Sequence, residues 1–140
     1  MNIMTVDYSM TLEQMIAAGS YDWKNSNITA KRFPLSDNDK VAFEPKLFHF
    51  HLHTSSKDAI KEMDKGGFRP AKIEELLTYG AILTDEQRKY PIVALGSVAK
   101  LDGSRGFACL VGDDVRRGLQ LSWLGNGWFS DHCRFLGVRK

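Results

Sequence analysis

Several features that mark specialised classes of protein are missing from this 140-residue sequence. It has only two cysteines, Cys109 and Cys133, which form neither a CxxC pair nor a disulfide framework. Its first residues include no basic flank and no long apolar run, so we expect no signal peptide. No stretch approaches the roughly 20 apolar residues of a membrane span. We therefore expect free thiols in a reducing cytoplasm, and the sequence leaves open whether the two cysteines pair.

An excess of charge of one sign is also missing. The chain has 19 Lys and Arg residues against 17 Asp and Glu residues, a formal net charge of +2. No run of basic residues is longer than a pair such as Arg116-Arg117, which is too short to follow a phosphate backbone, so no nucleic-acid partner is predicted. The GxSxG, HExxH, phosphate-loop and dinucleotide-binding motifs of common enzyme classes are absent as well.

The remaining composition is typical of one globular domain, with 43% hydrophobic and 26% charged residues. Apolar spacing predicts a short helix over 12–18 and two helices in the middle of the chain, over 57–65 and 72–79, the last ended by Gly80. Alternating or continuous apolar residues predict strands at 3–6, 41–53, 92–95, 106–111, 118–124 and 134–139. We therefore predict an α+β fold in which two helices pack on an antiparallel sheet.

Residue usage changes after residue 100. Lys, Glu, Gln and Met together account for 23 of the first 100 residues, but residues 101–139 contain only one of them, Gln120. One explanation is that helix-favouring residues are scarce in a segment of strands and turns. The other is that codons ending in a pyrimidine cannot encode these residues or Trp. A segment diversified at such codons would keep them only at fixed scaffold positions, here Gln120, Trp123 and Trp128.

Two short segments resemble C-type-lectin-like domains of the formylglycine-generating-enzyme type. They are GFRPAKIEELL at 67–77 and the terminal CRFLGVR at 133–139. Variable proteins of diversity-generating retroelements use that fold, so the resemblance implies a C-type-lectin-like domain with a diversified surface. The Glu-Pro-Asn and Trp-Asn-Asp signatures of calcium-binding lectins are absent, and calcium-dependent sugar binding is not implied.

Over its whole length the chain resembles a set of uncharacterised proteins from candidate-phylum bacteria. The matching segments are YDWKN at 21–25, RPA at 69–71, PIVALGSV at 91–98 and the terminal RFL and VRK. In that set the segment between Val98 and Arg134 differs most among members. The resemblance implies one domain over 1–140, with a scaffold at 1–100 and a variable binding face within 101–139.

Three histidines alternate within the predicted strand at 41–53. His49, His51 and His53 would share one strand face, and imidazoles placed in this way can bind zinc. They can equally belong to a solvated face, because no carboxylate follows at a recognisable spacing. A small metal-binding protein or enzyme that uses these histidines is the alternative interpretation, and a structural accessory without a ligand is the third.

Two further candidates for chemistry have simpler explanations. Cys133 is adjacent to His132, but neighbours on a strand point to opposite faces, so we expect no nucleophile pair. The pair Asp113-Asp114 beside a glycine is typical of a turn. We therefore expect no catalytic residue, no metal ligand and no cofactor.

The segment 125–133 combines aromatic and small polar side chains, as recognition loops do. Within it we expect Trp128 to point inward and Phe129 to point outward. The sequence thus predicts a non-catalytic module whose variable face, within 101–133, binds a protein or other macromolecular ligand. The predicted ligand-binding residues are Arg105, Phe107, Cys109, Arg116, Arg117, Ser122, Asn126, Phe129, Ser130, Asp131, His132 and Cys133.

Overall fold

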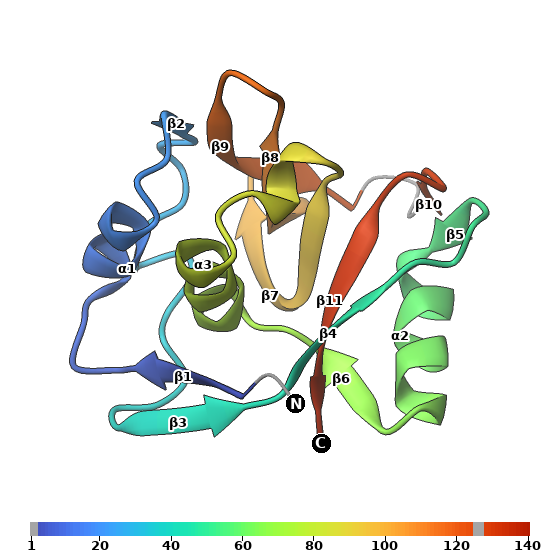
Figure 1. The fold of residues 1–140 in the computed structure, drawn as a ribbon, viewed down its shortest axis with the longest axis horizontal. Coiled ribbons are helices and arrows are strands. Elements are labelled where there is room, and N and C mark those ends of the chain that lie inside the picture. The colour runs from blue at the N-terminus through green and yellow to red at the C-terminus, as the bar shows by residue number, and fades with distance from the viewer. Residues whose placement is uncertain (1–2, 125–127) are drawn as a thin grey trace.

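The computed structural model describes residues 3–124 and 128–140, except for the side chain of Trp128, and shows a sheet with helices on both faces (Figure 1). In this part of the chain the helices are α1 (Leu12–Ala18), α2 (Ser56–Lys65), α3 (Ile73–Ile82) and the 3-10 turn η1 (Glu86–Arg88). The strands are β1 (Met4–Asp7), β2 (Trp23–Lys24), β3 (Lys40–Phe43), β4 (Pro45–Phe48), β5 (Thr54–Ser55), β6 (Phe68–Pro70), β7 (Ile92–Leu101), β8 (Ser104–Gly112), β9 (Arg117–Trp123), β10 (Trp128–Phe129) and β11 (Arg134–Arg139).

The main sheet has the strand order β2-β9-β8-β7-β11-β4, and β6 also pairs with β11. Most neighbours are antiparallel, but β11 runs parallel to β7, and β2 runs parallel to β9. The predicted α+β class and the predicted helices are confirmed, whereas the prediction of an antiparallel sheet is wrong because the sheet is mixed. The C-terminal strand enters the sheet beside β7, from which three strands separate it in the chain, and local hydrophobic patterns do not encode such a pairing.

Local capping explains where two of the helices begin. The Thr11 hydroxyl accepts a hydrogen bond from the Gln14 amide, and the Gln14 side chain accepts one from the Thr11 amide, which completes a capping box at α1. The Ser55 hydroxyl caps α2 through the Asp58 amide. The predicted helix over 12–18 is confirmed at both ends.

Gly80 lies inside α3 and does not end it, contrary to the sequence prediction. A side chain at this position would bring Cβ to 2.5 Å from the Tyr21 hydroxyl and 2.8 Å from Leu110 Cδ1. The glycine therefore permits close packing of α3 on β8 and on the segment after α1, and the helix continues for two more residues.

The predicted strand over 41–53 is interrupted. Strands β3 and β4 are separated at Glu44, and residues 49–53 form no strand. His51 has a φ of 60°, a left-handed conformation that a continuous strand does not admit. The three histidines therefore do not share one strand face.

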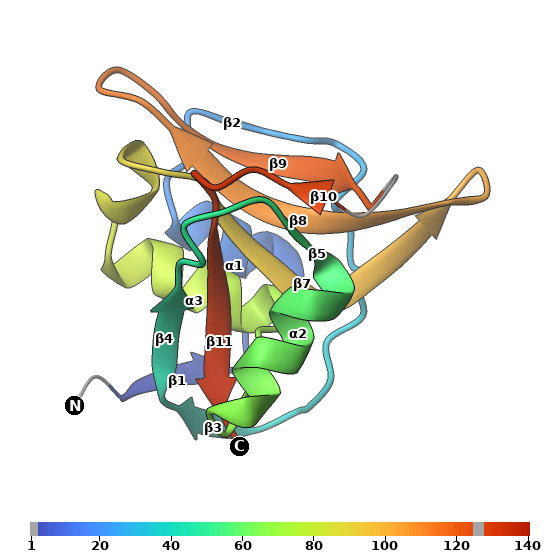
Figure 2. The same cartoon turned by 90° about the vertical axis from the view of Figure 1, so that its right-hand side faces the viewer.

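Side chains of the central strands alternate between two hydrophobic clusters, one on each face of the sheet. On β8, Leu110 belongs to the first cluster and Cys109 to the second; on β11, Leu136 belongs to the first and Phe135 to the second. Helices α1 and α3 cover the first face and α2 covers part of the second (Figures 1 and 2). The sheet is thus the middle layer of the fold.

Arg117, at the start of β9, is buried on the first face with 5% of its surface exposed. Its guanidinium donates to the carbonyls of Gly19 at 2.6 Å and Gly80 at 3.0 Å, and to Gln87 Oε1 at 3.0 Å. The Arg117 guanidinium also lies over the aromatic ring of Tyr21, with Cζ 4.9 Å from the ring centroid. None of the ion pairs in the described part of the chain includes Arg117, so backbone and amide oxygens take the place of a carboxylate partner.

Substitution of Arg117 by Met should strongly destabilise the fold, because it leaves three buried acceptors without their donor. Each buried unsatisfied group costs about 1–3 kcal/mol, so we expect the free energy of unfolding to fall by at least about 3 kcal/mol in urea denaturation. The neighbouring Arg116 is exposed, and Arg116→Met is the matched control, with an expected change within about 0.5 kcal/mol. Equal midpoints for the two variants would contradict this role of Arg117.

Candidate functional site

The second face of the sheet is only partly covered, and the open part forms a hollow. Helix α2 packs on β6, and its buried side chains meet Val93 and Phe135 in the second cluster. In the described part of the chain, the segment over 129–133 lies beside β8 and β9 and borders a hollow of about 310 Å³. Its lining residues are Pro91, Val93, Phe107, Cys109, Val111, Ser122, Trp123, Phe129, Ser130 and Cys133.

Phe129 forms one wall of this hollow. The pairing of Phe129 with Thr54 in β5 places its ring 5.4 Å from the ring of Phe107 and 5.1 Å from that of Phe135. The prediction that Phe129 points outward is therefore wrong, because the half-buried ring is an aromatic contact of the second cluster. The predicted inward direction of Trp128 lies outside the described residues.

A short turn forms the polar rim of the hollow. The Cys133 amide donates to the Ser130 carbonyl at 3.4 Å, and the Ser130 hydroxyl lies 3.6 Å from the Cys133 thiol. His49 Nε2 lies 2.6 Å from the Asp131 carbonyl oxygen and links this turn to the segment after β4. The rim is thus held in place by hydrogen bonds, while no charged side chain appears in the described lining of the hollow.

The two thiols of the hollow are free and differ in exposure. Burial, and then the nearby Cys133 thiol, raise the pKa of Cys109 to about 12. At neutral pH the Cys109 thiol is therefore protonated, and it is the thiolate that acts as a nucleophile. Cys133 is half-exposed at the rim.

Half of the twelve predicted ligand-binding residues line this one hollow. They come from β8, β9 and the 129–133 segment, and they are Phe107, Cys109, Ser122, Phe129, Ser130 and Cys133. Asp131 and His132 are exposed in the rim turn. Asn126 lies outside the described residues.

The three predicted arginines do not line the hollow. Arg105 and Arg116 are exposed, Arg105 on β8 and Arg116 in the turn between β8 and β9. Arg117 is buried on the opposite face, where its guanidinium binds Gly19, Gly80 and Gln87. It is therefore removed from the binding face that the sequence predicted.

Sequence reasoning missed four residues of the hollow, Pro91, Val93, Val111 and Trp123. Val93 lies in an apolar run that is buried on both sides, so its pattern does not tell one face from the other. The alternation of Leu119, Leu121 and Trp123 in the predicted strand at 118–124 predicts that Trp123 points inward, yet 48% of its surface is exposed. It lies near the end of β9, where the first cluster no longer covers the strand.

The histidines do not form a metal site in the described part of the chain. The rings of His49 and His51 lie 3.8 Å apart, but His49 Nε2 already faces the Asp131 carbonyl. His53 is exposed beyond the left-handed residue His51. Among the described residues, no three His, Cys, Asp or Glu side chains lie close enough together to hold a metal ion.

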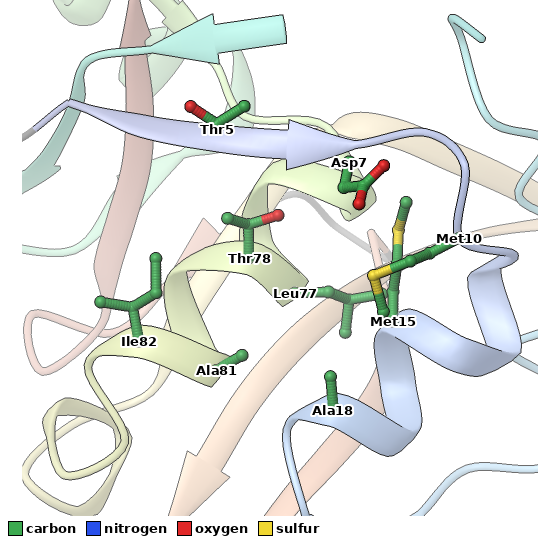
Figure 3. Close-up of a pocket in the computed structure, with 9 residues that line it drawn as sticks. All are labelled: Thr5, Asp7, Met10, Met15, Ala18, Leu77, Thr78, Ala81 and Ile82. Atoms are coloured by element: carbon green, nitrogen blue, oxygen red, sulfur yellow. The ribbon is translucent and has the colours of Figure 1, made fainter. Parts of the chain in front are cut away.

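A second hollow, of about 220 Å³, lies between β1, α1 and α3 (Figure 3). The thioethers of Met10 and Met15 lie close together at its α1 side, and Ile82 lies at the far end of α3. Two of its polar groups have partners within the chain: Asp7 Oδ1 accepts from Ser9, and the Thr78 hydroxyl donates to the Glu74 carbonyl. None of the predicted site residues contributes to it.

Comparisons with protein-family models, with curated proteins and with solved structures gave no match to this chain. In the part of the chain that the structure describes, no helix is long and apolar enough to cross a membrane. The geometry of its hollows is therefore the basis for inferring what the chain does.

The two thiols should react at very different rates with 5,5′-dithiobis(2-nitrobenzoate) in the native state. We expect Cys133 to react readily and Cys109 only after unfolding, because Cys109 is buried and protonated. The Cys133→Ser variant should lose the fast phase, and Cys109→Ser should retain it. A fast phase that persists in Cys133→Ser would contradict the assigned burial of Cys109.

Proposed function

We propose that this chain is a non-catalytic recognition module whose hollow beside β8, β9 and the 129–133 segment contacts a protein or other macromolecular ligand. One observation carries the proposal. Three segments that are separate in the chain bring half of the predicted ligand-binding residues around a single opening. Such convergence of aromatic and small polar side chains is what binding pockets require.

The lining indicates what the ligand inserts. Phe107 and Phe129 supply an apolar wall, and Ser122 and Ser130 supply hydroxyls. A volume of about 310 Å³ suits one large side chain, and interfaces commonly depend on an aromatic anchor in such a pocket. The uncharged lining favours an aromatic or aliphatic anchor over a charged one.

Two candidate nucleophiles of the hollow, Cys109 and Ser130, support binding rather than catalysis. The Cys109 thiol is held protonated by burial. The Ser130 hydroxyl contacts the Cys133 thiol and the His132 amide, neither of which is a general base. Without an activating base, these groups can donate and accept hydrogen bonds to a ligand but have no evident means of attacking it.

We further propose that the fold is C-type-lectin-like and that residues 101–133 are its diversified part. Strands β8 and β9 and the 129–133 segment all belong to the region poor in Lys, Glu, Gln and Met. The exception, Gln120, has a local role: its Oε1 accepts from the Leu121 amide at 3.0 Å and lies 3.5 Å from Asn25 Nδ2. A glutamine that binds the scaffold segment after β2 fits a fixed position.

A comparison of paralogues from the same genome tests the diversification. Substitutions should concentrate in 104–133 at exposed and hollow-lining positions such as Ser122, Phe129 and Ser130. Gln120 and the core residue Leu110 should stay constant. Substitutions spread evenly along the chain would remove the variable face from the proposal.

Titration with indole, followed by ¹H–¹⁵N correlation spectra, tests the hollow as a site for an aromatic anchor. We expect saturable shifts at Ser122, Phe129 and Ser130, and a loss of at least about tenfold in affinity when Ser122→Trp fills the hollow. Ser104→Trp places the same side chain at an exposed position of the same hairpin and should leave binding unchanged. Shifts confined to the hollow of Figure 3, or equal affinity in both variants, would refute the assignment.

A further inference from the structure

Three basic side chains line a third hollow, here called the basic hollow. Lys31, Arg32 and Lys100 surround a space of about 540 Å³. Lys31 and Arg32 precede the buried Phe33, and Lys100 lies on the long β7–β8 hairpin, which projects from the body of the fold (Figure 2). The described lining contains no acidic side chain.

The register of the hairpin adds a fourth cation. Lys100 pairs directly with Arg105 across β7 and β8. Residues directly opposite each other in an antiparallel pair have side chains on the same face, and like charges in this arrangement are destabilising. The ion pairs of the described chain include neither residue, and neither is paired with Asp102 in the intervening turn. An anion that binds here would relieve this repulsion.

The segment that carries Arg32 is anchored to α3. The carboxylate Oε2 of Glu74 accepts from the Ser36 amide at 3.1 Å and from the Ser36 hydroxyl at 2.7 Å. Lys72 Nζ also donates to the Ser36 hydroxyl, at 2.8 Å. The backbone near Arg32 is therefore held against α3 before any ligand arrives, which lowers the entropic cost of binding.

An adjoining hollow of about 260 Å³ shares Arg32 and extends toward Lys72 and Ser97. It also contains Glu74, which is fully buried. Although burial opposes ionisation, hydrogen bonds from Ser36 and Tyr8 hold the pKa of Glu74 below its ordinary value. The negative charge of Glu74 disfavours an anion at that end, so the cations favour the larger space between Lys31, Arg32 and Lys100.

We propose that the basic hollow binds a small ligand that carries two or more phosphate groups. The Arg32 guanidinium can bind phosphate oxygens in a bidentate manner, and the two lysines add point charges. A volume of about 540 Å³ exceeds the needs of one phosphate and accommodates a diphosphate or a phosphate ester. This site is separate from the uncharged hollow of the proposed function, with which it shares no lining residue.

Isothermal titration calorimetry with pyrophosphate, at constant ionic strength, tests the proposal on the intact chain. We expect binding of one pyrophosphate per chain, weaker binding of inorganic phosphate, and a loss of at least about tenfold in pyrophosphate affinity in Arg32→Gln and in Lys100→Gln. Lys57→Gln is the charge-matched control: Lys57 is exposed on α2 and lines a different hollow. The Lys57→Gln variant should bind pyrophosphate with the same affinity as the unsubstituted chain.

Absence of saturable binding at millimolar pyrophosphate would overturn the proposal. So would equal weakening by Lys57→Gln, which would indicate attraction to the overall charge. The proposal would also be overturned if a single-stranded oligonucleotide bound more tightly than pyrophosphate and lost this binding in Arg32→Gln and Lys100→Gln. The ligand of the basic hollow would then be a nucleic acid. Circular dichroism of each variant separates loss of binding from loss of fold.

Discussion

The buried guanidinium of Arg117 is the interaction on which the arrangement of this fold depends. A cation inside a protein needs compensation, and here it comes from oxygens at the C-terminal ends of two helices: Gly19 follows α1, and Gly80 lies in the last turn of α3. Carbonyl groups at helix C-termini carry partial negative charge, so the two dipoles together partly neutralise the guanidinium. Gln87 adds a third acceptor and joins η1 to the same centre. One side chain therefore fixes α1, α3 and η1 relative to β9.

As a result, the two faces of β8 and β9 lie in different surroundings. On the first face, Leu110 and Leu119 are fully buried beneath α1 and α3, where a change of volume would disturb the core. On the second face, Cys109 and Ser122 border a hollow that α2 does not reach. The proposed recognition surface therefore lies on the face of β8 and β9 opposite the Arg117 centre.

Local signals predicted the elements well, and long-range contacts account for the errors. The capping box at Thr11 and the apolar spacing after it fix α1, which was predicted at its observed bounds. Two predictions failed because of other contacts. The strand predicted over 41–53 is interrupted, and His51 within it adopts a left-handed conformation. Gly80 does not end α3, because it allows the helix to pack closely on β8. Arg116 and Arg117 are adjacent and identical in type, yet one is exposed and the other buried. The acceptors of Arg117 lie 98, 37 and 30 residues away, so no local pattern can distinguish the two.

The two proposed sites differ in chemistry but are connected through β8. Phe107 lines the uncharged hollow, and Arg105, two residues earlier on the same face, lies opposite Lys100 of the basic hollow. Two residues along a strand span about 6.6 Å, and the buried face of β8 holds that spacing fixed. The Leu124 amide donates a hydrogen bond to the Arg105 carbonyl at 2.9 Å, which also joins the residue after β9 to the start of β8. The sheet therefore sets the backbone spacing between Phe107, which lines the uncharged hollow, and Arg105, which lies opposite Lys100.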